Sequence, residues 1–134
     1  MGNNKKVLVI DDDVKIRRVL DLRLRKAGYQ VILAANGKEG LNLFKAEHPD
    51  MVITDILMPE KEGLETIMAL RRESPEVKII AMSGGGRIGG HDYLDFAKKF
   101  GAQYTFTKPF TGKEVLQAVR ELLDNSPGEK NTLG

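Results

Sequence analysis

Val7-Leu8-Val9-Ile10 leads directly into Asp11-Asp12-Asp13, so a short apolar run ends in three aspartates. Met51-Val52-Ile53-Thr54 ends in the same way, at Asp55. Short runs rich in β-branched residues are typical of buried strands, and a charged residue marks where such a strand ends. The sequence therefore predicts two strands of the same kind, each with a carboxylate at its carboxyl end.

Strand-like and helix-like segments alternate along the chain. Tyr104-Thr105-Phe106-Thr107 forms another β-prone run, and it leads into Lys108-Pro109. Between the strand-like runs, apolar residues recur every three or four positions, as on one face of a helix. Strands are expected at about 6–10, 30–34, 51–54, 78–82 and 103–107, and helices at about 14–27, 37–47, 64–73, 92–100 and 112–123. Five βα units predict an α/β fold with a doubly wound parallel sheet and right-handed crossovers.

The expected helices carry apolar faces. Apolar residues recur at helical spacing at Ile16, Val19, Leu20 and Leu24 in the first helix, and at Leu64, Ile67, Met68 and Leu70 in the third, with Met68 expected to fill the core. The residues expected to point inward in the second and fifth helices are Leu41, Phe44, Ala46, Val115, Leu116, Val119, Leu122 and Leu123.

Composition excludes several classes of protein. The chain has 134 residues, of which 41% are hydrophobic, and this suits one domain. It has no cysteine, which rules out disulfides, zinc-thiolate sites and thiol catalysis. Lys plus Arg is 21 and Asp plus Glu is 19, a balance that gives no case for direct nucleic-acid binding. No apolar run is long enough to span a membrane or to serve as a signal peptide, so a cytoplasmic protein is expected.

The expected domain covers residues 1–124. Residues 125–134 are polar and include Pro127 and two glycines, which predicts a flexible tail.

The charged residues at the strand ends are expected to meet. Carboxyl ends of parallel strands share one edge of the sheet, and ligands bind in the crevice there. Asp11, Asp12, Asp55 and Lys108 would then lie close together. Carboxylates at such short range repel one another, and a divalent cation is the usual remedy. The sequence therefore predicts a metal site at this edge.

Four motifs at the strand ends carry a family resemblance. They are Ile10-Asp11-Asp12-Asp13, Thr54-Asp55-Ile56-Leu57-Met58-Pro59 with Gly63, Ala81-Met82-Ser83-Gly84, and Thr107-Lys108-Pro109-Phe110. In this order the chain resembles the receiver domain of two-component response regulators, which includes the chemotaxis receiver. The resemblance runs from about Val7 to Leu123. It implies a flavodoxin-like fold, with a five-stranded parallel sheet in strand order 2-1-3-4-5 and five helices.

The resemblance also implies a chemistry for the acidic residues. Asp55 would be the phosphoacceptor, since phosphoryl transfer asks mainly for positioning and charge neutralisation. Asp11 and Asp12 resemble the acidic pair that holds Mg²⁺ in this family, with Asp12 on the metal and Asp11 contacting it through water. Asp55 and the backbone carbonyl of Leu57 would supply further oxygen ligands.

Two other residues would act on the phosphoryl group. By the resemblance, the hydroxyl of Ser83 would bond a phosphoryl oxygen after transfer. Lys108 would pair with the Asp55 carboxylate and later with the phosphoryl group. The family usually has a cis peptide bond before the proline, here Pro109.

The partners are implied by the same resemblance. A sensor histidine kinase or a phosphotransfer protein would donate the phosphoryl group, and a downstream target protein would bind the surface of helix four, strand five and helix five. The protein would be no enzyme on other molecules and would catalyse only its own phosphorylation and dephosphorylation. We expect a single-domain regulator or phosphorelay intermediate, as a monomer or a weak phosphorylation-dependent dimer.

Two features depart from the family pattern. Many receivers have an aromatic residue three positions before the lysine, where this chain has Thr105. The segment 84–90 is longer than usual, and five of its seven residues are glycine. Glycine costs ordering entropy, so we expect this loop to be flexible and to reorganise on activation.

Other interpretations stay open. Asp13 suits an N-cap of the first helix, and the whole aspartate run could serve that purpose. A pseudo-receiver, an interaction module that is never phosphorylated, would share the fold. Gly84-x-Gly86-x-x-Gly89 formally matches a dinucleotide fingerprint, which leaves a nucleotide-binding flavodoxin-like protein as a weaker alternative.

Overall fold

Five parallel strands form one sheet in the computed structural model of the chain, which describes residues 5–56, 62–84, 87–88 and 91–124. The elements in chain order are β1 (Lys6–Ile10), α1 (Val14–Lys26), β2 (Gln30–Ala34), α2 (Gly37–Glu47), β3 (Met51–Asp55), α3 (Glu62–Glu73), β4 (Lys78–Ser83), β5 (Arg87–Ile88), β6 (His91–Asp92), α4 (Tyr93–Lys99), β7 (Tyr104–Thr107) and α5 (Gly112–Leu123). The order across the sheet is β2-β1-β3-β4-β7. The predicted order 2-1-3-4-5 is therefore confirmed, with β7 as the fifth strand.

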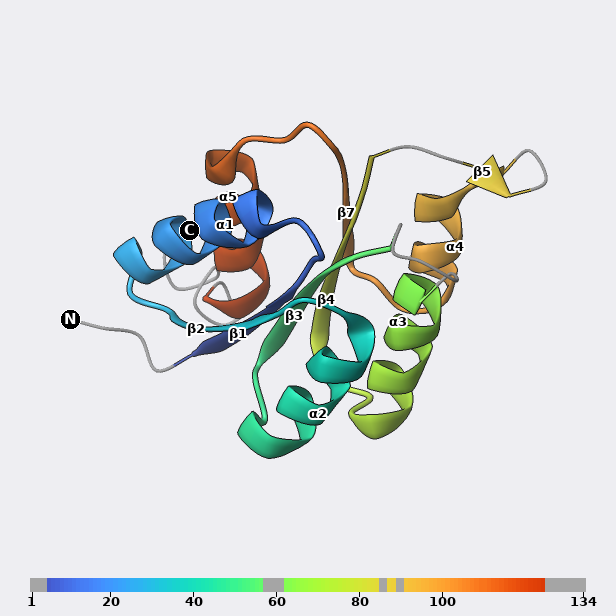
Figure 1. Cartoon of the computed structure of the whole chain (residues 1–134), viewed down its shortest axis with the longest axis horizontal. Helices are drawn as coiled ribbons and strands as arrows, with labels where there is room; N and C mark the ends of the chain where they lie inside the picture. The colour runs from blue at the N-terminus through green and yellow to red at the C-terminus, as the bar shows by residue number, and fades with distance from the viewer. Residues whose placement is uncertain (1–4, 57–61, 85–86, 89–90, 125–134) are drawn as a thin grey trace, which may run out of the picture.

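Helices cover both faces of the sheet. Figure 1 shows α1 and α5 together on one face and α2, α3 and α4 on the other. Successive residues of a strand point to opposite faces of the sheet, so their side chains pack into two hydrophobic cores, one on each face. Leu8 and Ile10 of β1 belong to the core under α2, α3 and α4, whereas Val7 and Val9 belong to the core under α1 and α5. No helix in the described ranges is long and apolar enough to cross a membrane.

Side chains fix where three of the helices begin. The Asp13 carboxylate accepts a hydrogen bond from the backbone N–H of Lys15 and caps α1, as one interpretation of the aspartate run predicted. Asn36 caps α2 in the same way. Thr111 and Glu114 form a reciprocal capping box at the start of α5. These caps begin the helices immediately after the loops that leave the carboxyl edge of the sheet.

Three expected core residues are exposed. Ala46 of α2 is one of them. Val19 of α1 is 49% exposed and Met68 of α3 is 39% exposed, so all three predictions were wrong. Leu20 and Ile67, the chain neighbours of Val19 and Met68, are fully buried. Successive residues on a helix are rotated by about 100° around its axis. Only a narrow stripe of each helix contacts the sheet, and Val19 and Met68 lie outside that stripe although they belong to the apolar pattern.

The segment after β4 differs from the expected single loop. Arg87–Ile88 and His91–Asp92 pair as a short antiparallel ladder, and α4 begins at Tyr93 rather than at Asp92. The rest of the expected flexible loop, residues 85–86 and 89–90, lies outside the described residues, as do Leu57 and the expected tail 125–134.

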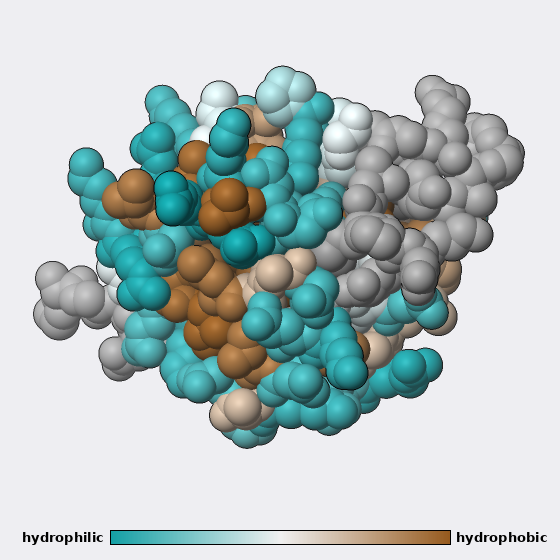
Figure 2. Space-filling view, in the orientation of Figure 1, coloured by the Kyte–Doolittle hydropathy of each residue, from teal (hydrophilic) through white to brown (hydrophobic). Residues whose placement is uncertain are grey.

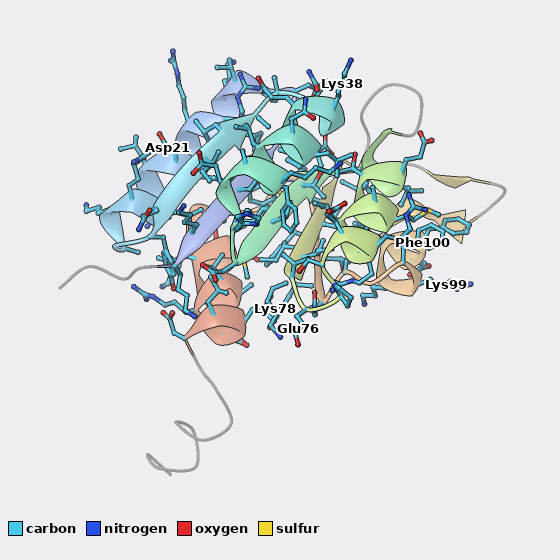
Figure 3. The ribbon with its side chains drawn as sticks, turned by 90° about the horizontal axis from the view of Figure 1, so that it is seen from below. Asp21, Lys38, Glu76, Lys78, Lys99 and Phe100 are labelled. Atoms are coloured by element: carbon cyan, nitrogen blue, oxygen red, sulfur yellow. The ribbon has the colours of Figure 1, made fainter. Side chains whose placement is uncertain are left out.

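The carboxyl and amino edges of the sheet lie on opposite sides of the molecule. In Figure 3, Lys38 lies near the start of α2, on the side where β2 ends, whereas Glu76 and Lys78 mark the amino end of β4. Figure 2 shows a mostly hydrophilic face with apolar residues gathered over the edge strand β2, where Ile32 and Leu33 are half-buried. The candidate site lies at the carboxyl edge.

Candidate functional site

Strand register brings four predicted site residues to one edge of the sheet. Ile10 pairs with Thr54 and Asp55 pairs with Met82, so β1, β3 and β4 end at nearly the same level. Ser83 pairs with Thr107, the last residue of β7. Asp11, Asp55, Ser83 and Lys108 follow or close these adjacent strands, which lie side by side in Figure 1.

Three carboxylates converge at this edge. Asp11, Asp12 and Asp55 each offer an oxygen, and these oxygens all lie within 4.8 Å of one another. Asp11 and Asp55 are buried, at 0% and 3% exposure, whereas Asp12 is exposed. The third aspartate of the run, Asp13, is occupied as the cap of α1. The aspartate run thus divides between a cluster and a helix cap.

Lys108 reaches into the acidic cluster from the end of β7. Its Nζ donates a hydrogen bond to Asp11 Oδ2 at 2.9 Å and lies 3.6 Å from Asp55 Oδ2. The Lys108–Pro109 peptide bond is cis, as predicted. One ammonium therefore faces two buried carboxylates, and Asp11 is the nearer of them.

Burial and charge shift the titration of this pair. Burial raises the pKa of the Asp11 carboxyl, and the Asp55 charge adds to the rise, against hydrogen bonds from Asp13 and Lys108 that lower it. Burial alone would lower the pKa of the Lys108 ammonium. Its hydrogen bond to Asp11 and the two carboxylate charges outweigh that effect, so the pKa of Lys108 is raised. Lys108 therefore stays protonated at neutral pH.

The donor set fits a divalent cation. Mg²⁺ prefers hard oxygen ligands and is commonly bound through a few carboxylates with waters in the remaining positions. Three carboxylates against one ammonium leave an excess of negative charge when all are ionised. The exposed position of Asp12 leaves this side of the cluster accessible from solvent.

Ser83 and Lys108 are joined through the backbone. The N–H of Lys108 donates to the carbonyl of Ser83 at 2.7 Å, which extends the ladder between β4 and β7 by one residue. Ser83 is fully buried at the end of β4. Thr105, the residue in place of the expected aromatic, is half-buried and pairs with Ala81.

Sequence reasoning missed one residue of this region. No motif of the sequence singles out Arg17, but it is half-buried and its Nη1 donates to the backbone carbonyl of Asp11 at 2.6 Å. The sequence feature that could have pointed to Arg17 is a basic residue on the first turn of the helix that follows the aspartates. Nothing in the helical period distinguishes it from its exposed neighbour Arg18.

Comparisons with known proteins agree with this geometry. Residues 7–120 match the family model for the response regulator receiver domain. The probable transcriptional regulator ycf27 of Cyanophora paradoxa is 40% identical over 121 residues, which are 90% of this chain and 49% of that protein. Sporulation initiation phosphotransferase F of Bacillus subtilis is 33% identical over 120 residues, 90% of this chain and 94% of that protein. The chain thus spans about half the length of the ycf27 relatives that it matches.

Solved structures give the same result. A CheY-like receiver domain protein of Methanospirillum hungatei JF-1 superposes with a TM-score of 0.83 at 28% identity, covering 98% of this chain and 100% of that one. Chemotaxis protein CheY4 of Vibrio cholerae reaches a TM-score of 0.80 at 29% identity, over 90% of this chain and all of that one. The chain belongs to the response regulator receiver domains of two-component and phosphorelay signalling.

Proposed function

We propose that Asp55 accepts a phosphoryl group from a phosphohistidine of a sensor histidine kinase or phosphotransfer protein, in a reaction that depends on Mg²⁺. The observation that carries this proposal is the convergence of the Asp11, Asp12 and Asp55 carboxylates within 4.8 Å, with the Lys108 ammonium against two of them. A helix cap or a structural ion pair needs no such cluster.

In phosphoryl transfer the protein mainly positions the reacting groups and neutralises charge. A carboxylate oxygen of Asp55 forms the new bond to phosphorus while the bond from phosphorus to the donor nitrogen breaks and its electron pair leaves with that nitrogen. Asp55 is held rigidly at the end of β3, in the middle of the sheet. When bound, Mg²⁺ supplies the positive charge that offsets the crowded oxygens. Asp11 and Asp12 would hold it with Asp55, and the carbonyl of Leu57 remains a predicted ligand.

Lys108 and Ser83 would bind the phosphoryl group once it is on Asp55. Phosphorylation adds about 1.5 to 2 negative charges, by analogy with other phosphorylated side chains. The Lys108 ammonium, already 3.6 Å from Asp55, is placed to pair with the new oxygens. The hydrogen bond from Lys108 N–H to the Ser83 carbonyl would couple the ends of β4 and β7. The response would therefore spread to α4, β7 and α5, which we propose as the surface for a downstream target.

The relatives support a role in a relay of this kind. The sporulation initiation phosphotransferase of Bacillus subtilis bears the name of a phosphoryl-transfer protein and is 33% identical to this chain over 94% of its own length. We infer that this receiver domain acts through protein contacts and catalyses only its own phosphorylation and dephosphorylation.

Incubation with acetyl phosphate and Mg²⁺, followed by intact-protein mass measurement, tests the proposal. One added phosphoryl group is expected, and none when EDTA replaces Mg²⁺. An unmodified wild-type protein that also fails to bind Mg²⁺ would identify a pseudo-receiver instead.

A further inference from the structure

Every polar atom of Asp11 has a partner. Its N–H donates to the Ala34 carbonyl at 3.1 Å, and its Oδ1 accepts from the Asp13 N–H at 2.9 Å. Its Oδ2 accepts from Lys108, and its backbone carbonyl accepts from Arg17 Nη1 at 2.6 Å. Asp11 is therefore held by four residues from three parts of the chain: α1 with its cap, the end of β2, and the residue after β7.

Asp12 has no comparable support of its own. Within the described part of the chain, no hydrogen bond or ion pair of the Asp12 carboxylate is found, and the side chain is exposed. Its oxygen nevertheless lies within 4.8 Å of those of Asp11 and Asp55. The direction of this side chain is therefore set by the backbone on either side of it.

The carbonyl that Arg17 binds belongs to the peptide bond between Asp11 and Asp12. A peptide unit is planar, and this one contains the nitrogen and the Cα of Asp12. A hydrogen bond that holds the Asp11 carbonyl oxygen therefore also holds the Asp12 backbone from which the side chain starts. A hydrogen bond from a guanidinium to a carbonyl is charge-assisted and stronger than a neutral one. Arg17 is half-buried on α1, whose start is itself fixed by the Asp13 cap.

We propose that Arg17 is a positioning residue for the cation site: by binding the Asp11 carbonyl, it holds the peptide that aims the Asp12 carboxylate at Asp11 and Asp55. This inference rests on the proposed Mg²⁺-dependent function. Groups that orient metal ligands from outside the ligand set commonly contribute 10-fold to 100-fold to metal affinity, and Arg17 acts one peptide away from the ligand.

Electrostatics alone predicts the opposite effect. Arg17 carries a positive charge beside a cation site, and removing a like charge strengthens cation binding. A positioning role predicts that the same change weakens it. The sign of the effect therefore separates the two interpretations, and the exposed neighbour Arg18 serves as a control of equal charge.

The test is Mg²⁺ affinity measured by titration calorimetry on metal-free wild type, Arg17→Gln, Arg17→Lys and Arg18→Gln. Arg17→Gln is expected to weaken binding by about 10-fold. Arg17→Lys, which keeps the charge and a donor, is expected to lose less. Arg18→Gln is expected to bind Mg²⁺ as the wild type does or slightly more tightly. In acetyl phosphate assays, Arg17→Gln should raise the half-saturating Mg²⁺ concentration while the rate at saturating Mg²⁺ stays within about twofold, since Arg17 touches no reacting atom.

Unchanged or tighter Mg²⁺ binding by Arg17→Gln would overturn the inference, and so would an equal loss in Arg18→Gln or a collapse of the saturated rate. If Arg17→Gln does not fold by circular dichroism, Arg17→Met, which keeps the aliphatic stem but has no donor, decides. Weaker Mg²⁺ binding at the wild-type melting temperature supports the inference, and wild-type or tighter binding overturns it. A wild-type protein that does not bind Mg²⁺ would defeat the proposed function itself.

Discussion

Lys108 donates a hydrogen bond to Asp11, a residue 97 positions away in the chain, at 2.9 Å. Asp55, the partner expected from the family resemblance, is farther from the same ammonium, at 3.6 Å. Lys108 thus partly neutralises the buried Asp11 while remaining within reach of Asp55. This arrangement keeps the proposed acceptor close to a positive charge that lies nearer still to Asp11.

The raised pKa of Asp11 leads to a stability prediction. In the folded protein Asp11 holds its proton to higher pH than in the unfolded chain, so without metal the free energy of unfolding falls as pH rises from about 3.8 through the folded pKa. Asp11→Asn mimics the protonated form. Asp55 still faces Lys108 in this variant, and the loss of the buried Asp11 charge removes its repulsion with Asp55. The free energy of unfolding is therefore expected to rise by about 1 kcal/mol in EDTA at neutral pH.

Urea denaturation at several pH values checks this, and the gain should shrink toward acid pH. Millimolar Mg²⁺ should favour the wild type instead, because the variant lacks a ligand that binding needs. A variant less stable than wild type in EDTA at neutral pH would contradict the account.

Gly63 and Gly84 should respond differently to alanine. A Cβ on Gly63 would meet the Cα of Ile56 and lie 2.7 Å from the Asp55 carbonyl, both backbone atoms beside the acceptor. Gly63→Ala is expected to cost about 2 to 3 kcal/mol and to impair phosphorylation. A Cβ on Gly84 meets nothing within 4 Å, so Gly84→Ala should stay within about 0.5 kcal/mol of wild type. Thermal unfolding of both variants checks the pair, and a harmless Gly63→Ala would be inconsistent with this close approach of the start of α3 to the end of β3.

Ser83→Ala should separate phosphorylation from its response. Ser83 is buried at the end of β4, and its hydroxyl is the predicted contact to a phosphoryl oxygen. Alanine removes that hydroxyl but keeps the carbonyl that accepts from the N–H of Lys108. Thr107, the partner of Ser83 across the ladder, is exposed. We expect Ser83→Ala to be phosphorylated within about 10-fold of the wild-type rate, since one neutral hydrogen bond contributes about 1.5 kcal/mol at most. Its amide chemical-shift changes in β7 and α5 on phosphorylation should be reduced, and those of Thr107→Ala should not. Wild-type shift changes in Ser83→Ala would argue against a role of the Ser83 hydroxyl in the response.

The sequence predicted the sheet and its carboxyl edge because short apolar runs ending in charge are a local signal. Where a helix rests on the sheet is a tertiary property, so Val19 and Met68 were misplaced while Leu20 and Ile67 were placed correctly. The ladder at Arg87–Ile88 was missed because two-residue strands among glycines carry no periodicity. Arg17 was missed for a related reason: its partner is a backbone carbonyl, which no residue pattern encodes.

The most direct measurement is to locate the phosphoryl group on the chain. Borohydride reduces an aspartyl phosphate to homoserine, so phosphorylation with acetyl phosphate and Mg²⁺, then reduction and peptide mass analysis, marks the acceptor. Homoserine is expected at position 55 alone, and no product is expected from Asp55→Asn. Homoserine at Asp12 or Asp13 in the wild type, or no reduced residue under conditions where Mg²⁺ binds, would contradict the assignment of Asp55 as the acceptor.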